Sequence, residues 1–146
     1  MHESMHQLEG GCHCGTITVT YRTAIAPEAT TPRACQCTFC RKHQTRAISD
    51  PAGRLEIVVR DPAGISRYRF GLGTADFLIC RTCGVYVAAF MPDPDDAHGF
   101  ATLMASALEP DVRFPDPVPA HYDAEDAAAK RARRRRMWTP AVLRSA

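Results

Sequence analysis

The residues best placed to do chemistry are seven cysteines in three closely spaced groups: Cys12-x-Cys14, Cys35-x-Cys37-x-x-Cys40 and Cys80-x-x-Cys83. An odd number of cysteines cannot pair completely as disulfides within one chain. Pairs of thiolates at such spacing are typical of zinc sites, because a tight turn directs two sulfurs towards one point. Gly15 and Gly84 each follow a cysteine directly, where the backbone must turn sharply. The pattern predicts zinc binding.

Seven sulfurs divide naturally into four and three. Cys12 and Cys14 with Cys80 and Cys83 would form a closed four-sulfur site, the arrangement typical of structural zinc. The remaining three would leave one zinc position open, the arrangement typical of catalytic zinc; these are Cys35, Cys37 and Cys40. We therefore predict two zinc ions, one structural and one at an active site.

Two other interpretations of the cysteines stay open. The paired cysteines could be buried free thiols or a redox Cys-x-x-Cys motif, although no βαβ pattern surrounds Cys80 and Cys83 as it would in a thioredoxin-like protein. The group of three could instead form a second structural site if His43 or His13 supplied a fourth ligand.

The elements that must position these groups are mainly short strands. Alternating apolar and β-branched residues, bounded by turn signals, predict strands at five main places: 16–21, 55–59, 65–70, the pair 77–80 and 85–91, and 100–104. The run Met91–Asp96 predicts an exposed loop, because two prolines and three aspartates lie in it. Residues 123–137 predict a helix that is acidic early and basic late, matching the helix dipole. The fold class is therefore mainly β with a C-terminal helix.

The composition narrows the class of protein to which the chain can belong. The 146 residues are 45% hydrophobic with a net charge of +2, ordinary values for one globular domain. No run approaches the roughly 18 apolar residues of a membrane span, and the first ten residues do not resemble a secretory signal. We expect a cytoplasmic protein that does not associate with a membrane. We divide it into an N-terminal arm (1–9), a zinc-binding domain (10–109), and a proline-rich extension with a basic helix (110–146).

The three cysteine motifs, in this order, resemble those of the glutathione-dependent formaldehyde-activating enzyme family, which includes the centromere protein V relatives. The similarity runs from about Gly10 to Leu108 and includes the residues that follow the ligands, such as Arg41 and Lys42. Two positions depart from the family pattern. Gln36 stands where histidine is common, and Ile79 replaces a common aromatic residue.

The resemblance implies a zinc-stapled, all-β fold of the Mss4-like kind with short antiparallel strands. It also implies the same division of the cysteines into a structural and an active-site group. The family activity is addition of glutathione to formaldehyde, which is a carbon–sulfur lyase reaction in reverse. The expected partners are therefore a small-molecule thiol, glutathione or similar, and a small aldehyde.

Basic residues suggest two further sites. Arg41, with Lys42 and Arg46, could bind the carboxylates of an anionic thiol or could form a solvated turn; Arg41 is the strongest candidate. The run Lys130–Arg136 holds six of the 18 basic residues. It supports an alternative hypothesis, a non-catalytic zinc-stabilised module that binds nucleic acid, although we favour a terminal helix with its charges in water. Phe39, Phe77, Tyr86 and Phe90 are expected in the core rather than in a substrate wall.

Overall fold

The computed structural model describes residues 5–146, in which eleven strands form one connected sheet. The strands are β1 (His6–Gly11), β2 (Ile17–Thr23), β3 (Arg33–Cys35), β4 (Ala47–Ile48), β5 (Arg54–Val59), β6 (Ile65–Tyr68), β7 (Asp76–Cys80), β8 (Tyr86–Asp95), β9 (His98–Met104), β10 (Val118–Ala120) and β11 (Thr139–Ser145). The helices are α1 (Thr38–His43) and α2 (Ala127–Met137), with single 3-10 turns at Pro27–Ala29, Pro62–Gly64 and Ala105–Ala107. The predicted fold class, mainly β with a C-terminal helix, is confirmed.

The sheet branches at β9. One edge of β9 pairs with β11 and, further along, with β4, while the other edge pairs with β8. Beyond β11 the order continues through β5 and β2 to β1, and beyond β8 it continues through β7 to β6. The sheet is mixed, because β11 runs parallel to β5 and β10 runs parallel to β3. All other pairings of named strands within residues 5–146 are antiparallel.

The core follows from alternation along the strands. In β2 the side chains of Ile17, Val19 and Tyr21 are almost fully buried, while those between them are more exposed. This period of two places every second side chain on the inner face. β8 differs, since its first six residues are all buried. Packing on both faces makes β8 a central strand of the domain.

The expected loop at Met91–Asp96 is wrong, although Pro94, Asp95 and Asp96 are exposed as predicted. Met91 is buried, and β8 continues to Asp95 before a tight turn leads into β9. Asp95 Oδ1 accepts hydrogen bonds from the backbone N–H groups of Ala97 and His98, each at 2.9 Å, and so builds that turn. The pairing of β8 with β9 is irregular between Pro92 and Asp95. Prolines are tolerated in strands at such irregularities, because the missing N–H costs little there.

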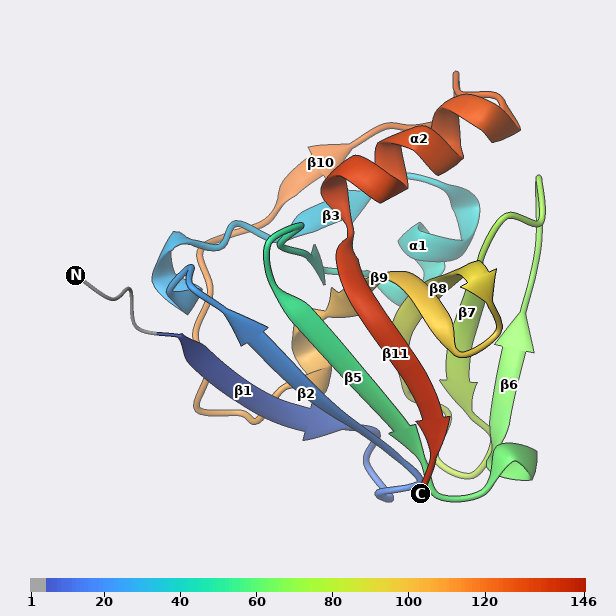
Figure 1. Cartoon of the computed structure of the whole chain (residues 1–146). Coiled ribbons are helices and arrows are strands. Elements are labelled where there is room, and N and C mark those ends of the chain that lie inside the picture. The colour runs from blue at the N-terminus through green and yellow to red at the C-terminus, as the bar shows by residue number, and fades with distance from the viewer. Residues whose placement is uncertain (1–4) are drawn as a thin grey trace.

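The C-terminal segment contributes the least expected element. The predicted helix forms as α2, which begins after Asp126, whose carboxylate accepts a hydrogen bond from the Ala129 N–H at 2.8 Å. The chain then enters the sheet as β11, between β5 and β9 (Figure 1). Residues 110–146, expected as an extension, therefore include a strand with partners on both edges.

Within residues 5–146, neither helix combines the length and apolar character that a membrane span requires.

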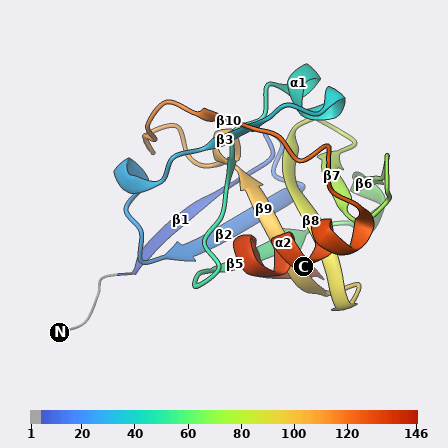
Figure 2. The same cartoon turned by 90° about the horizontal axis from the view of Figure 1, so that it is seen from above.

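Four elements gather at one end of the sheet. In Figure 1, α1, α2, β3 and β10 all lie towards the upper end of the domain. Figure 2 looks down on this end and shows β3 beside β10, with α1 and α2 on opposite sides of the domain. The chain segments that reach this end are far apart in sequence, and two of them carry the motifs of interest. The second cysteine group runs from the end of β3 into α1, and α2 contains the basic run.

Candidate metal centres

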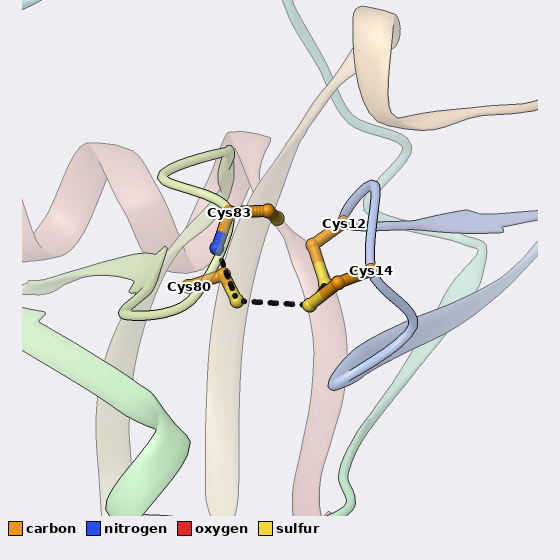
Figure 3. A group of neighbouring side chains, drawn as sticks. All are labelled: Cys12, Cys14, Cys80 and Cys83. Carbon is orange, nitrogen blue, oxygen red and sulfur yellow. Dashed lines mark hydrogen bonds between the residues drawn. The ribbon is translucent and has the colours of Figure 1, made fainter.

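The first cluster joins two loops that are far apart in sequence. Cys12 and Cys14 lie in the β1–β2 loop, Cys80 ends β7, and Cys83 lies in the turn to β8. Their four sulfurs lie within 4.8 Å of one another. The Sγ atoms of Cys14 and Cys80 are 3.5 Å apart across a separation of 66 residues (Figure 3). The structure therefore brings together the four cysteines that the spacing grouped.

Backbone turns direct these sulfurs inward. Gly15 and Gly84 have positive φ angles of 86° and 79°, a conformation that favours glycine. The backbone N–H of Ile17 donates to Cys12 Sγ at 3.2 Å, and that of Cys83 donates to Cys80 Sγ at 3.4 Å. Such donors favour the ionised form of a thiol, which is the form that binds metals.

The second cluster is built around α1. Cys35 ends β3, Cys37 caps α1 and Cys40 lies within it, and the three sulfurs lie within 4.8 Å of one another. Cys37 Sγ accepts a hydrogen bond from the Cys40 N–H at 3.4 Å and so takes the part of the N-cap side chain. A helix of six residues was not predicted; it results from this local cap and brings Cys40 back towards Cys37.

Neither His43 nor His13 joins the second cluster, whose ligand atoms lie within 4.8 Å of one another. Among the described residues, the second cluster contains cysteines alone. The His43 ring instead packs against Phe39, with centroids 4.4 Å apart, and against Tyr86 at 5.5 Å. The second cluster thus offers three sulfurs, and the first offers four.

The pKa values of the thiols show why a cation suits both clusters. A hydrogen bond with Cys40 lowers the pKa of Cys35 to about 5, and the charge of Lys130 acts in the same direction. The same contact with Cys35, together with burial, raises the pKa of Cys40 far above its usual range. In the first cluster, hydrogen bonding with Thr16 lowers the pKa of Cys14 to about 6, while burial raises that of Cys12 to about 11. Neighbouring thiols therefore cannot all ionise unless a positive charge lies among them, and zinc accepts such donor sets.

The two clusters have different surroundings. The second lines a cavity of about 590 Å³, a volume typical of small-molecule sites. Its lining includes all three cysteines of this cluster, and aromatic residues that include Phe70, Phe77 and Tyr86. No cysteine of the first cluster is among the described residues that line it. The cavity therefore gives access to the three-sulfur cluster only.

The predicted substrate-binding residue Arg41 lines this cavity, and so does Gln36, whose Nε2 donates to the Ala34 carbonyl at 2.7 Å. Lys42 and Arg46 do not line it. Phe90 is fully buried in the core, as expected. Phe77 and Tyr86 pack with Phe39 in an aromatic cluster and also form part of the cavity wall.

Sequence reasoning missed the contribution of α2. Lys130, Arg133 and Arg134 line the cavity, and Arg134 is only 7% exposed. The expectation that the charges of this helix lie in water is wrong for Arg134. The spacing of Arg134 and Trp138, which places them on one face of a helix, was the available signal. The Arg134 guanidinium carbon lies 4.6 Å from the centroid of the Trp138 ring.

Two comparisons with known proteins bear on this arrangement. The family model described as glutathione-dependent formaldehyde-activating enzyme matches residues 7–122. That match includes both cysteine clusters and ends before α2 and β11. A crystal structure of a Rhodobacter sphaeroides protein is similar, with 24% sequence identity and a TM-score of 0.53, over 75% of this chain and 99% of that chain. At this identity the likeness concerns the fold.

Proposed function

The chain belongs to the glutathione-dependent formaldehyde-activating enzyme family, and on that premise we propose that it joins a thiol to a small aldehyde at the Cys35, Cys37 and Cys40 cluster. In this reaction the thiol sulfur bonds to the carbonyl carbon, and the thiol proton passes to the carbonyl oxygen. The reverse direction breaks the same carbon–sulfur bond, so the enzyme is of the carbon–sulfur lyase type. Glutathione and formaldehyde are the proposed pair.

The observation that carries the proposal is the difference between the two clusters. Three cysteines that line a cavity of about 590 Å³ offer a metal ion fewer ligands than zinc requires. When bound by Cys35, Cys37 and Cys40, zinc supplies positive charge that favours a thiolate and polarises a carbonyl group. The four-sulfur cluster lies away from the cavity, and we assign it a structural zinc that ties the β1–β2 loop to the β7–β8 turn.

Residues around the cavity would bind and orient the thiol and the aldehyde. Phe70, Phe77 and Tyr86 give the cavity an apolar wall, and a bound substrate that displaces water there would strengthen electrostatic interactions near the reacting groups. Burial holds the pKa of Tyr86 well above its usual range, so its hydroxyl keeps its proton and is available as a donor within the cavity. Arg41, at the same cavity, would help to position the substrate.

The alternative, a binding module that uses the basic run on nucleic acid, has less support. Arg134 is buried, Arg133 pairs with Glu125 at 2.9 Å, and Arg135 pairs with Asp93 at 2.6 Å. Phosphate recognition depends on exposed cations, and these three side chains are already engaged within the protein.

A panel of thiols tests the proposed substrates. We expect the zinc-loaded protein to accelerate exchange between formaldehyde and its glutathione adduct, measured by exchange NMR, at least 10-fold above the spontaneous rate. Cysteine and 2-mercaptoethanol, which lack the extended shape of glutathione, should show weaker acceleration because they fill less of the cavity. Spontaneous rates with every thiol would contradict the proposal, and equal acceleration with all of them would contradict glutathione as the thiol.

A further inference from the structure

Arg134 is a buried cation for which no carboxylate partner is found in residues 5–146. It is 7% exposed and lines the cavity, yet it forms no ion pair with any described residue. Glu125, whose charge favours the charged form of Arg134, is bound to Arg133. A buried charge without a counter-charge is unfavourable unless a ligand supplies one.

The contacts that Arg134 does make leave it incompletely satisfied. Its Nη1 donates to Thr74 Oγ1 at 2.5 Å, and its guanidinium lies over the Trp138 ring. Its Nε is buried and has no hydrogen-bond partner. Thr74 and Trp138 fix the position of the side chain but carry no negative charge. Burial lowers the pKa of Arg134 to about 10, which still leaves it charged at neutral pH.

Other cations face the same cavity. Arg33 donates to Ser49 Oγ at 2.8 Å and to Thr102 Oγ1 at 3.1 Å, and it too has no carboxylate partner among the described residues. Lys130 of α2 also lines the cavity. Asp123 is the one carboxylate among the described lining residues. The cavity is therefore positively charged along the wall that contains α2.

We propose that the cavity selects a substrate that carries a carboxylate group, which Arg134 binds while the reacting end of the substrate reaches the Cys35, Cys37 and Cys40 cluster. This inference rests on the proposed function and assigns specificity to α2, which lies outside residues 7–122 matched by the family model. A guanidinium matches the planar, two-oxygen geometry of a carboxylate. Arg134 is on this account a binding residue for the unreactive part of the substrate.

Binding of S-methylglutathione, which retains both carboxylates but cannot react through sulfur, tests the inference without catalysis. The readouts are the ¹⁵N–¹H resonance of Arg134 Nε, assigned by its loss in Arg134→Met, and the affinity from calorimetry. We expect saturable movement of this resonance and about 10- to 100-fold weaker binding to Arg134→Met, the effect of losing a charge-assisted hydrogen bond. Arg134→Lys should recover part of the affinity.

Arg135→Met is the matched control, because Arg135 neighbours Arg134 on α2 but is exposed and does not line the cavity. Its affinity for S-methylglutathione should equal that of the unmodified protein. The diethyl ester of S-methylglutathione, tested on the unmodified protein, should bind as weakly as Arg134→Met binds the free acid. The comparison of the diethyl ester with the free acid uses the unmodified protein, so it does not depend on the folding of any variant.

Each opposite result would overturn the inference. It fails if the diester binds as tightly as the free acid, or if the Arg134 resonance does not respond to S-methylglutathione. If inorganic phosphate moves the Arg134 resonance and S-methylglutathione does not, the site binds another oxyanion and the inference is wrong. Because none of these measurements involves formaldehyde, they separate this inference from the proposed reaction, which the exchange experiment tests by itself.

Discussion

Replacing Cys80 with serine is expected to abolish the folded state, whereas replacing Cys37 with serine should leave it intact. Cys80 is buried, and its sulfur faces Cys14 from a strand 66 residues away. A structural zinc site contributes about 10–16 kcal/mol of binding free energy, as much as the whole stability of a small domain, about 5–15 kcal/mol. Loss of one of four ligands therefore removes enough stability to unfold the protein.

Cys37→Ser is the matched comparison, because both variants exchange one sulfur for one oxygen in a cysteine cluster. Serine can still cap α1 in place of Cys37. We expect a melting temperature within about 5 °C of the unmodified protein and one zinc fewer per chain. Thermal unfolding by circular dichroism and zinc content by plasma mass spectrometry provide the two readouts. Equal loss of structure in both variants would contradict separate roles for the clusters.

Removing β11 by ending the chain after Met137 should have an equally large effect. β11 pairs with β5 from Ala141 to Ser145 and with β9 from Thr139 to Val142. Its loss exposes edges of two central strands and removes the buried side chains of Thr139, Ala141 and Leu143. Each lost backbone hydrogen bond costs about 0.5–1.5 kcal/mol net, and an uncovered side chain the size of leucine costs about 1.5–3 kcal/mol, so the sum is comparable to the stability of a typical domain.

The shortened chain should lack the dispersed amide signals of a folded protein in a proton–nitrogen NMR spectrum. The control is Arg144→Ala in the full chain, which keeps β11 and removes an exposed ion pair with Glu56 of β5 and a hydrogen bond to the Ser145 carbonyl. Its spectrum should match that of the unmodified protein. A native spectrum from the shortened chain would show that residues up to 137 fold without β11.

Local features of the sequence predicted the cysteine groupings and the main strands. The spacing of Cys80 and Cys83 fixes both in one turn, and the alternation of Ile17, Val19 and Tyr21 indicates one buried face. These signals depend on neighbours within a few residues. The pairing of Cys12 and Cys14 with Cys80 and Cys83 followed from counting ligands, and the structure brings the four sulfurs together.

The remaining features depend on contacts that are distant in sequence. β11 carries a weak apolar pattern and includes Pro140, so only its position between two strands stabilises it. β1 is an edge strand with a largely polar sequence, paired on one side with β2. The burial of Arg134 depends on Thr74, 60 residues away. The arginine run alone does not distinguish Arg134 from Arg135, although one is buried and the other is exposed, and the spacing of Arg134 to Trp138 was the one local signal.

We propose that the three-sulfur cluster at the cavity performs the chemistry. The most direct test is the rate of exchange between formaldehyde and its glutathione adduct, measured by NMR for the unmodified protein and for folded Cys37→Ser at equal concentration. We expect accelerated exchange with the unmodified protein and the spontaneous rate with Cys37→Ser. Equal acceleration by both proteins would contradict it.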